Sequence, residues 1–198
     1  MPNSKKLAIV LIDGFADWEY PLLAASARQW FGIDTRFFTP SGEPVTSIAG
    51  LMFRDGAPFS LIDLDSGDAL AVIGSDNWAA ASAPDISQYL ATCIENEVII
   101  GGICAGTLPL AKAGMFANHH HTSNSRDWIM ENAGNYAGAE NYQDRPYAVR
   151  QNRVVSAPGS APGTFAVEML NAMLPDQTEQ IGEMKNMFAN EFLAGANQ

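Results

Sequence analysis

The stretch Gly101-Gly102-Ile103-Cys104-Ala105-Gly106 contains the residue most able to do chemistry, a cysteine two positions from a glycine on each side. The apolar run before it predicts a buried strand, and the run after it predicts a helix that follows without a loop. This is the spacing of a nucleophile elbow, in which a sharp turn exposes the side chain. Because a helix N-terminus favours a thiolate, we expect a Cys104 pKa below the usual value of about 8.5. The Ala105 N–H is a candidate oxyanion donor.

A cysteine at a strand end can also be a small buried apolar residue. The abrupt change from strand to helix and the flanking glycines favour the reactive interpretation for Cys104. Cys93 lies in a predicted helix without such a context, and we interpret it as a core residue. Two cysteines without a CxxC spacing predict neither a disulfide framework nor a zinc site, which favours a reducing cytoplasm.

Composition excludes several classes of protein. The 198 residues carry a formal net charge of −11. Such an acidic chain lacks the basic surface that nucleic-acid binding needs, and anionic membranes would repel it. No apolar run reaches the roughly 18 residues of a membrane span. The length predicts one domain, residues 1–198. We therefore expect no nucleic-acid partner and no membrane association.

Short apolar runs alternate with longer amphipathic segments, and this pattern is typical of an α/β sheet with crossover helices. The predicted strands are 7–12, 33–39, 68–73 and 98–103, with a small hairpin or an irregular edge at 45–54 and a hairpin at 147–156. The predicted helices are 17–31, 84–96, 105–113, 125–132, 164–174 and 177–193. Pro109, inside one of these helices, predicts a kink.

Four segments in this order resemble the ThiJ/PfpI superfamily, a flavodoxin-like group that includes intracellular-protease-like proteins and the Parkinson-associated deglycase. They are Phe15-Ala16-Asp17-Trp18-Glu19, Ala71-Val72-Ile73-Gly74, Gly102–Gly106 continuing through Leu110–Met115, and Ala157–Ala166. The resemblance covers nearly the whole chain. It implies a three-layer sandwich with a mostly parallel central sheet, helices on both faces and a cysteine at the nucleophile elbow.

Glu19 matches the acidic residue that hydrogen-bonds the nucleophilic cysteine in that family. Taken alone, an acidic residue in the first turn of a helix merely complements the helix dipole. With the resemblance, Glu19 is a candidate catalytic residue. Two negative charges side by side repel each other, so we infer that Glu19 is protonated when Cys104 is ionised.

The sequence departs from the family after the third strand, where Gly74-Ser75-Asp76-Asn77-Trp78 stands in place of the usual Gly-Gly. Gly74 can keep the close approach of the backbone, whereas Ser75 brings a side chain to the oxyanion loop. We expect Asp76, Asn77 and Trp78 at the mouth of the pocket. For Trp78, packing on a helix is an equal alternative.

All three histidines are consecutive, His119 to His121. No histidine follows them, which excludes the His-x-Glu pair of a true glutamine amidotransferase. Many family members place a histidine about twenty residues after the cysteine, and here Asn124 occupies that position, which makes it a candidate pocket residue. His121 is the nearest candidate base, with His120 as an alternative. A solvated loop and a metal site are the other interpretations, although no Cys, Asp or Glu in the segment completes a ligand set.

Two functions use the same residues. The first is an enzyme in which the Cys104 thiolate attacks a small amide or a reactive carbonyl such as an α-oxoaldehyde, assisted by Glu19. The alternative is a redox sensor in which Cys104 is oxidised to sulfenic or sulfinic acid. A binding module without chemistry is a third, weaker reading. We expect a small-molecule substrate, no cofactor and no metal, and the resemblance implies a homodimer.

Overall fold

The first strand shows how the sequence builds a sheet that is buried on both sides. In β1 (Lys6–Val10) and just beyond it, Leu7, Ile9 and Leu11 pack into one hydrophobic cluster, whereas Ala8 and Val10 pack into another. Alternate side chains of a strand point to opposite faces, so an apolar run without polar interruption requires cover on both faces.

The computed structural model describes residues 4–195, and its main sheet has seven strands in the order β5-β2-β1-β6-β7-β9-β8. All neighbouring strands are parallel except β8, which runs antiparallel to β9. The other strands are β2 (Asp34–Thr39), β5 (Ala57–Pro58), β6 (Ala69–Val72), β7 (Ile99–Ile103), β8 (Val149–Gln151) and β9 (Val154–Ala157).

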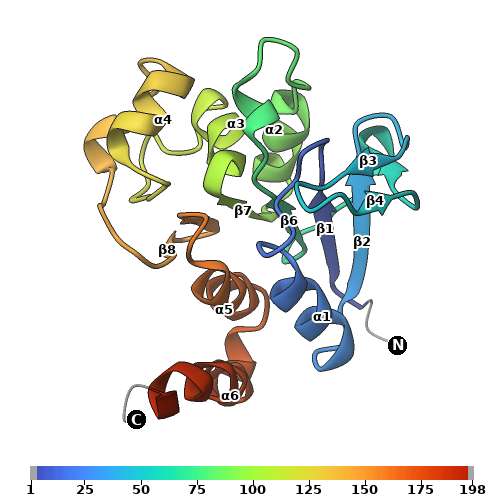
Figure 1. The fold of residues 1–198 in the computed structure, drawn as a ribbon, viewed down its shortest axis with the longest axis vertical. Helices are drawn as coiled ribbons and strands as arrows, with labels where there is room; N and C mark the ends of the chain where they lie inside the picture. The colour runs from blue at the N-terminus through green and yellow to red at the C-terminus, as the bar shows by residue number, and fades with distance from the viewer. Residues whose placement is uncertain (1–3, 196–198) are drawn as a thin grey trace.

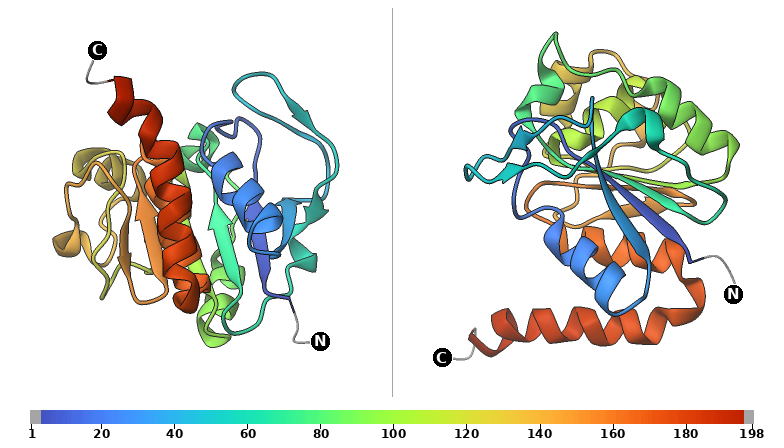
Figure 2. Two further views of the ribbon diagram at one scale, coloured as in Figure 1. Left: turned by 90° about the horizontal axis from the view of Figure 1, so that it is seen from below. Right: turned by 90° about the vertical axis from the view of Figure 1, so that its right-hand side faces the viewer.

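Helices cover both faces of this sheet, as Figure 1 shows. Helices α1 (Pro21–Gln29) and α5 (Pro162–Met173) lie on one face, and α6 (Thr178–Gly195) lies outside them (Figure 2). Helices α2 (Ser87–Glu95), α3 (Thr107–Lys112) and α4 (Arg126–Ala133) pack on the other face. The predicted three-layer architecture is therefore confirmed. Within residues 4–195, no helix is long and apolar enough to cross a bilayer.

Four adjacent parallel strands bring their carboxyl ends to one edge of the sheet. Val10 pairs with Val72, Val72 with Gly102, and Ile103 with Ala157, so β1, β6, β7 and β9 end side by side. Ligands of open α/β sheets bind beyond this edge. The loops that follow these strands carry most of the candidate residues.

Several helices begin later than the sequence predicts. The first helix begins at Pro21 rather than at residue 17, because the fixed φ of proline suits the first helical position. Glu19 therefore lies in a turn that precedes α1. Helix α3 begins only at Thr107, after the 3₁₀ turn Cys104–Gly106, so Pro109 falls in its first turn. A missing N–H has no consequence there, and the predicted kink has no cause.

The predicted hairpin at 45–54 is present as a separate two-stranded sheet of β3 (Val45–Thr46) and β4 (Met52–Phe53). Its tip is tied to the loop after β1, since the Ile48 N–H donates to the Phe15 carbonyl (3.0 Å). Short 3₁₀ helices complete the fold at Phe59–Leu61, Asp76–Ala79, Ala139–Asn141 and Pro175–Gln177.

Candidate active site

Cys104 stands at the turn between β7 and the 3₁₀ helix that leads into α3. Ile103 is extended, with φ −122°, whereas Cys104 has φ +55°, which an L residue with a side chain rarely adopts. The Thr107 hydroxyl donates to the Cys104 carbonyl (2.6 Å) and also contacts the Ser123 hydroxyl (2.7 Å). These two hydroxyls fix the peptide after the strained residue. Non-glycine residues in such a conformation cluster at functional sites.

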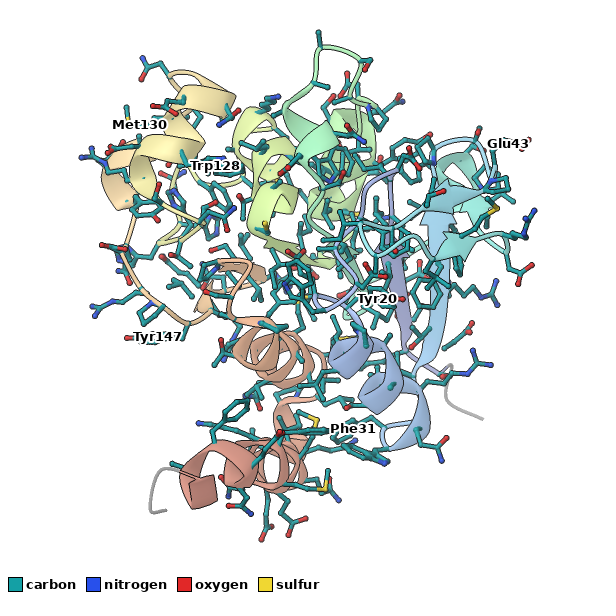
Figure 3. The ribbon with its side chains drawn as sticks, viewed as in Figure 1. Tyr20, Phe31, Glu43, Trp128, Met130 and Tyr147 are labelled. Atoms are coloured by element: carbon teal, nitrogen blue, oxygen red, sulfur yellow. The ribbon has the colours of Figure 1, made fainter. Side chains whose placement is uncertain are left out.

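Glu19 reaches this turn from the loop after β1. Its side chain is buried, with 1% of the residue exposed, and Oε2 accepts a hydrogen bond from the Gly74 N–H (2.7 Å). The next residue, Tyr20, packs edge-on against Phe15 and Phe37 between α1 and the sheet (Figure 3). This aromatic contact anchors the turn that carries the carboxyl group.

Gly74 lies between Glu19 and Cys104 and leaves room for both. A Cβ atom added to it would be 2.6 Å from Glu19 Oε2 and 2.7 Å from the Cys104 Cβ, which no real Cβ tolerates. The Glu19 Oε1 atom is buried and has no hydrogen-bond partner among residues 4–195. It lies against the Cys104 thiol. One oxygen of the Glu19 carboxyl group therefore remains able to exchange a proton with the sulfur.

The pKa values of this pair follow from burial. Burial raises the pKa of Glu19 to about 7, although the Gly74 N–H and the contact with Cys104 lower it. Burial also raises the pKa of Cys104 to about 11, and the negative charge of Glu19 adds to this rise. Asn124 and the Ala105 N–H act in the opposite direction. The predicted lowering of the Cys104 pKa is therefore wrong, because burial of the thiol and the charge of Glu19 outweigh the hydrogen bonds that favour a thiolate.

Asn124 and Trp18 hold one peptide over the sulfur. The Asn124 amide donates from Nδ2 to Cys104 Sγ (3.2 Å), and its Oδ1 accepts from the Gly159 N–H (2.9 Å). The indole N–H of Trp18 donates to the Gly159 carbonyl (3.0 Å). A Cβ atom on Gly159 would be 2.9 Å from Cys104 Sγ and 3.2 Å from Glu19 Oε1. Gly159 therefore borders both reacting groups.

Ser75 and Asn77 brace the neighbouring loop. The Ser75 hydroxyl donates to the Asp13 carbonyl (2.6 Å) and accepts from the Asn77 N–H (3.2 Å). The Asn77 amide donates to the same Asp13 carbonyl (2.8 Å). Gly74 has given its own N–H to Glu19. The side chains of Ser75 and Asn77 thus join two loops of the site.

Trp78 lies in the core rather than beside Cys104. It is 1% exposed, and its indole N–H donates to the Ile73 carbonyl (2.9 Å). A buried indole with its N–H satisfied is a packing residue, which is the alternative interpretation that the sequence left open.

His121 is also buried, with 0% exposed, and both of its ring nitrogens are engaged. Nδ1 contacts the His119 carbonyl (3.0 Å) and Nε2 contacts the Tyr136 hydroxyl (2.8 Å), while the ring stacks on Phe116 at 4.1 Å. Burial lowers the pKa of His121. The structure does not bring its ring to Cys104. In the part of the chain that the structure describes, no three His, Cys, Asp or Glu side chains are grouped as metal ligands.

Comparison with known proteins places this arrangement in a family. The model of the DJ-1/PfpI family matches residues 5–172. The chain belongs to the DJ-1/PfpI family. A DJ-1 superfamily protein of Agrobacterium tumefaciens has 34% identity and a TM-score of 0.86, with 95% of this chain and 99% of that chain covered. A ThiJ/PfpI family protein of Bacillus anthracis has 26% identity and a TM-score of 0.79, with 86% and 84% covered.

A curated relative is the uncharacterized protease YoaZ of Bacillus subtilis, which is 28% identical over 86% of this chain and 84% of its own length. A second, the uncharacterized protease YdeA of the same organism, is 28% identical over 95% of this chain and 92% of its own length. The resemblance that the sequence motifs indicated is therefore confirmed at the level of the family.

Three residues of this DJ-1/PfpI protein were not singled out from sequence. Thr107 follows Cys104 by three positions, where a hydroxyl can reach back to a carbonyl of its own turn. Trp18 and Gly159 are separated by 141 positions, and no local pattern predicts their hydrogen bond. The position of Trp18 directly before Glu19 is the one sequence feature that could have indicated its place at the site.

Proposed function

We propose that this protein is a cysteine-dependent enzyme that acts on small reactive carbonyl compounds, with α-oxoaldehydes as the substrate class. One observation carries the proposal: the buried, unpartnered Oε1 of Glu19 faces the thiol of a cysteine held at φ +55°. A general base works best with a pKa near the working pH, and the pKa of Glu19 is about 7.

In the first step, the Glu19 carboxylate takes the proton of the Cys104 thiol. The sulfur forms a bond to the aldehyde carbon, and the C=O π electrons move to the oxygen, which receives the proton back from Glu19. The product is a hemithioacetal. The N–H of Ser75, which makes no hydrogen bond within residues 4–195, and the N–H of Ala105 are the candidate donors to the transient oxyanion.

In the second step, Glu19 removes the proton from the former aldehyde carbon, and the electron pair moves through an enediolate onto the ketone oxygen. That oxygen takes up the proton of the adjacent hydroxyl, and Glu19 returns its own proton to the neighbouring carbon, which gives a thioester. Water then hydrolyses the thioester, releasing an α-hydroxy acid and the free thiol. The overall reaction adds one water to the α-oxoaldehyde, and the aldehyde carbon is oxidised while the ketone carbon of the same molecule is reduced. It needs no cofactor, oxidant or reductant.

Peptide hydrolysis, which the names of the two Bacillus relatives suggest, is less well supported. A peptide nitrogen must be protonated to leave, and that proton would have to come from Glu19 alone, because the other side chain that contacts Sγ is the amide of Asn124, which cannot supply one. A carbonyl addition has no such leaving group.

The test is the rate of methylglyoxal consumption by the wild type, Cys104→Ser and Glu19→Gln between pH 5 and 9. The wild-type kcat/KM should rise with pH through about 7 as Glu19 loses its proton. Cys104→Ser should be inactive, and Glu19→Gln should lose the rise near pH 7. Absence of turnover by the wild type, or cleavage of a peptide substrate in its place, would refute the proposal.

Oxidation of Cys104 is a second candidate function. Two peroxide molecules would convert the thiol to sulfenic and then sulfinic acid, each releasing one water. The protonated Glu19 and the Asn124 amide could both donate to the new oxygens, since each contacts the sulfur. A mass increase of two oxygens on the Cys104 peptide after mild peroxide treatment, without carbonyl turnover, would favour this function.

A further inference from the structure

Trp18 combines high exposure with a fixed position. The residue is 56% exposed, yet its indole N–H is bound to the Gly159 carbonyl. An exposed tryptophan ordinarily changes rotamer freely, whereas this hydrogen bond favours one rotamer. The structure therefore presents a fixed aromatic surface to solvent.

Gly159 connects the indole of Trp18 with the sulfur of Cys104. Gly159 receives the indole N–H on its carbonyl, and its Cα side borders Cys104 Sγ, where an added Cβ would be only 2.9 Å away. Asn124 holds the N–H of the same residue (2.9 Å). Gly159 thus contacts the indole through its carbonyl and borders the thiol through its Cα side.

The carboxylate next to Trp18 in the sequence is engaged by the neighbouring hairpin. The carboxylate of Asp17 accepts from the Ala49 N–H (3.0 Å) at the tip of the β3–β4 hairpin. The same tip exposes the apolar side chains of Ile48 and Leu51. With a net charge of −11, the protein as a whole disfavours anionic ligands at long range.

We propose that Trp18 is a specificity-determining residue that selects reactive carbonyl substrates carrying a neutral, planar aromatic substituent. This inference rests on the proposed function of Cys104. The substituent would lie against the indole while the carbonyl carbon reaches Sγ. Stacked aromatic pairs contribute beyond their buried area, so the preference should be about three- to tenfold over an aliphatic analogue.

The experiment separates the preference from catalysis by using thiol reagents. The rates at which N-phenylmaleimide and N-methylmaleimide modify Cys104 are measured by peptide mass spectrometry, which resolves it from Cys93, and their ratio is divided by the ratio for a free thiol. The ratio of kcat/KM for phenylglyoxal and methylglyoxal is measured in parallel. The variants are Trp18→Leu and Trp18→Phe. The matched control is Trp30→Leu, because Trp30 is 50% exposed and packs on Phe188 of α6.

In the wild type, the normalised maleimide ratio should exceed one by about three- to tenfold. Trp18→Leu should reduce it to about one, Trp18→Phe should retain part of it, and Trp30→Leu should leave it unchanged. An unchanged ratio in Trp18→Leu would overturn the proposal. Equal loss in the Phe and Leu variants would also overturn it, since the N–H anchor rather than the ring would then matter.

Two further outcomes are informative. If the wild type is a dimer that Trp18→Leu dissociates and the wild-type ratio is near one, a second copy covers the indole and the proposal is wrong. If neither carbonyl compound is consumed but the maleimide preference follows Trp18, the proposed enzymatic function fails while the aromatic selectivity of the site stands.

Discussion

Asn124 joins Cys104 to Gly159 through the two ends of one amide. Its Nδ2 donates to Sγ at 3.2 Å and its Oδ1 accepts from the Gly159 N–H at 2.9 Å. An amide can do both at once because it carries a donor and an acceptor in one plane. The position of the sulfur and the position of the loop after β9 are therefore set by the same side chain.

Replacing Asn124 by alanine should slow the alkylation of Cys104. The amide lowers the pKa of the thiol, and its loss should raise that pKa further. Hydrogen bonds to charged groups contribute about 1.5–3 kcal/mol, so the rate of iodoacetamide labelling at pH 8 should fall about tenfold. Asn132→Ala is the control, because the Asn132 amide donates to the Trp128 carbonyl within α4. Equal rates in the wild type and Asn124→Ala would contradict this role.

The burial of Glu19 should make the protein less stable above neutral pH. Its pKa rises from the ordinary value of 4.5 to about 7 on folding. A raised folded-state pKa gives stability that is complete below pH 4.5 and lost as the pH rises through 7. The shift corresponds to about 3 kcal/mol. The free energy of unfolding in urea is measured at pH 5 and pH 8.5 for the wild type and for Glu19→Gln. It should fall by about 3 kcal/mol more in the wild type than in the variant between these two pH values. An equal fall in both proteins would show that Glu19 is not the cause.

A methyl group at position 159 should block the thiol. In Gly159→Ala the new Cβ would meet Cys104 Sγ at 2.9 Å, so either the loop or the sulfur must move. Misplacement near a reacting atom is costly, and labelling of Cys104 should slow on the order of tenfold or more. Gly163→Ala is the matched control, since a Cβ there meets nothing within 4 Å. An unchanged rate of Cys104 labelling in Gly159→Ala would show that the loop moves aside and does not block the thiol.

His121 should matter for stability and not for reactivity. His121→Ala removes a ring that stacks on Phe116 and leaves the buried Tyr136 hydroxyl without its partner. The free energy of unfolding should fall by about 2–4 kcal/mol. Cys104 labelling should stay within a factor of two of the wild type under conditions where the variant remains folded. His121→Gln, which can keep a hydrogen bond, should lose less stability. A stable variant with a strongly reduced labelling rate would instead support the general-base hypothesis for His121.

The sheet could be predicted from sequence because its strands are short apolar runs. Leu7, Ile9 and their neighbours predict a strand buried on both faces, and the glycines around Cys104 predict the turn. Helix starts were less predictable, because the pattern before Pro21 is compatible with helix and the choice depends on Glu19 reaching Gly74.

The parts that sequence could not determine are long-range or depend on burial. The elbow spacing predicts a lowered Cys104 pKa, but burial and Glu19 raise it. Whether Trp78 lies at the pocket mouth or in the core depends on the Ile73 carbonyl that accepts its N–H. His121 and Asn124 are three positions apart, and only the path of the loop decides which of them meets the sulfur.

The hydrogen bonds that define the site join distant parts of the chain. Glu19 and Gly74 are 55 positions apart, Asn124 and Gly159 are 35 apart, and Trp18 and Gly159 are 141 apart. Contacts this remote form only after long loops have closed. A nascent or partly unfolded chain would thus carry Cys104 as an ordinary thiol with neither its carboxyl neighbour nor its covering loop. The chemistry of this sulfur is a property that the chain acquires only when β1, β6, β7 and β9 are all in place.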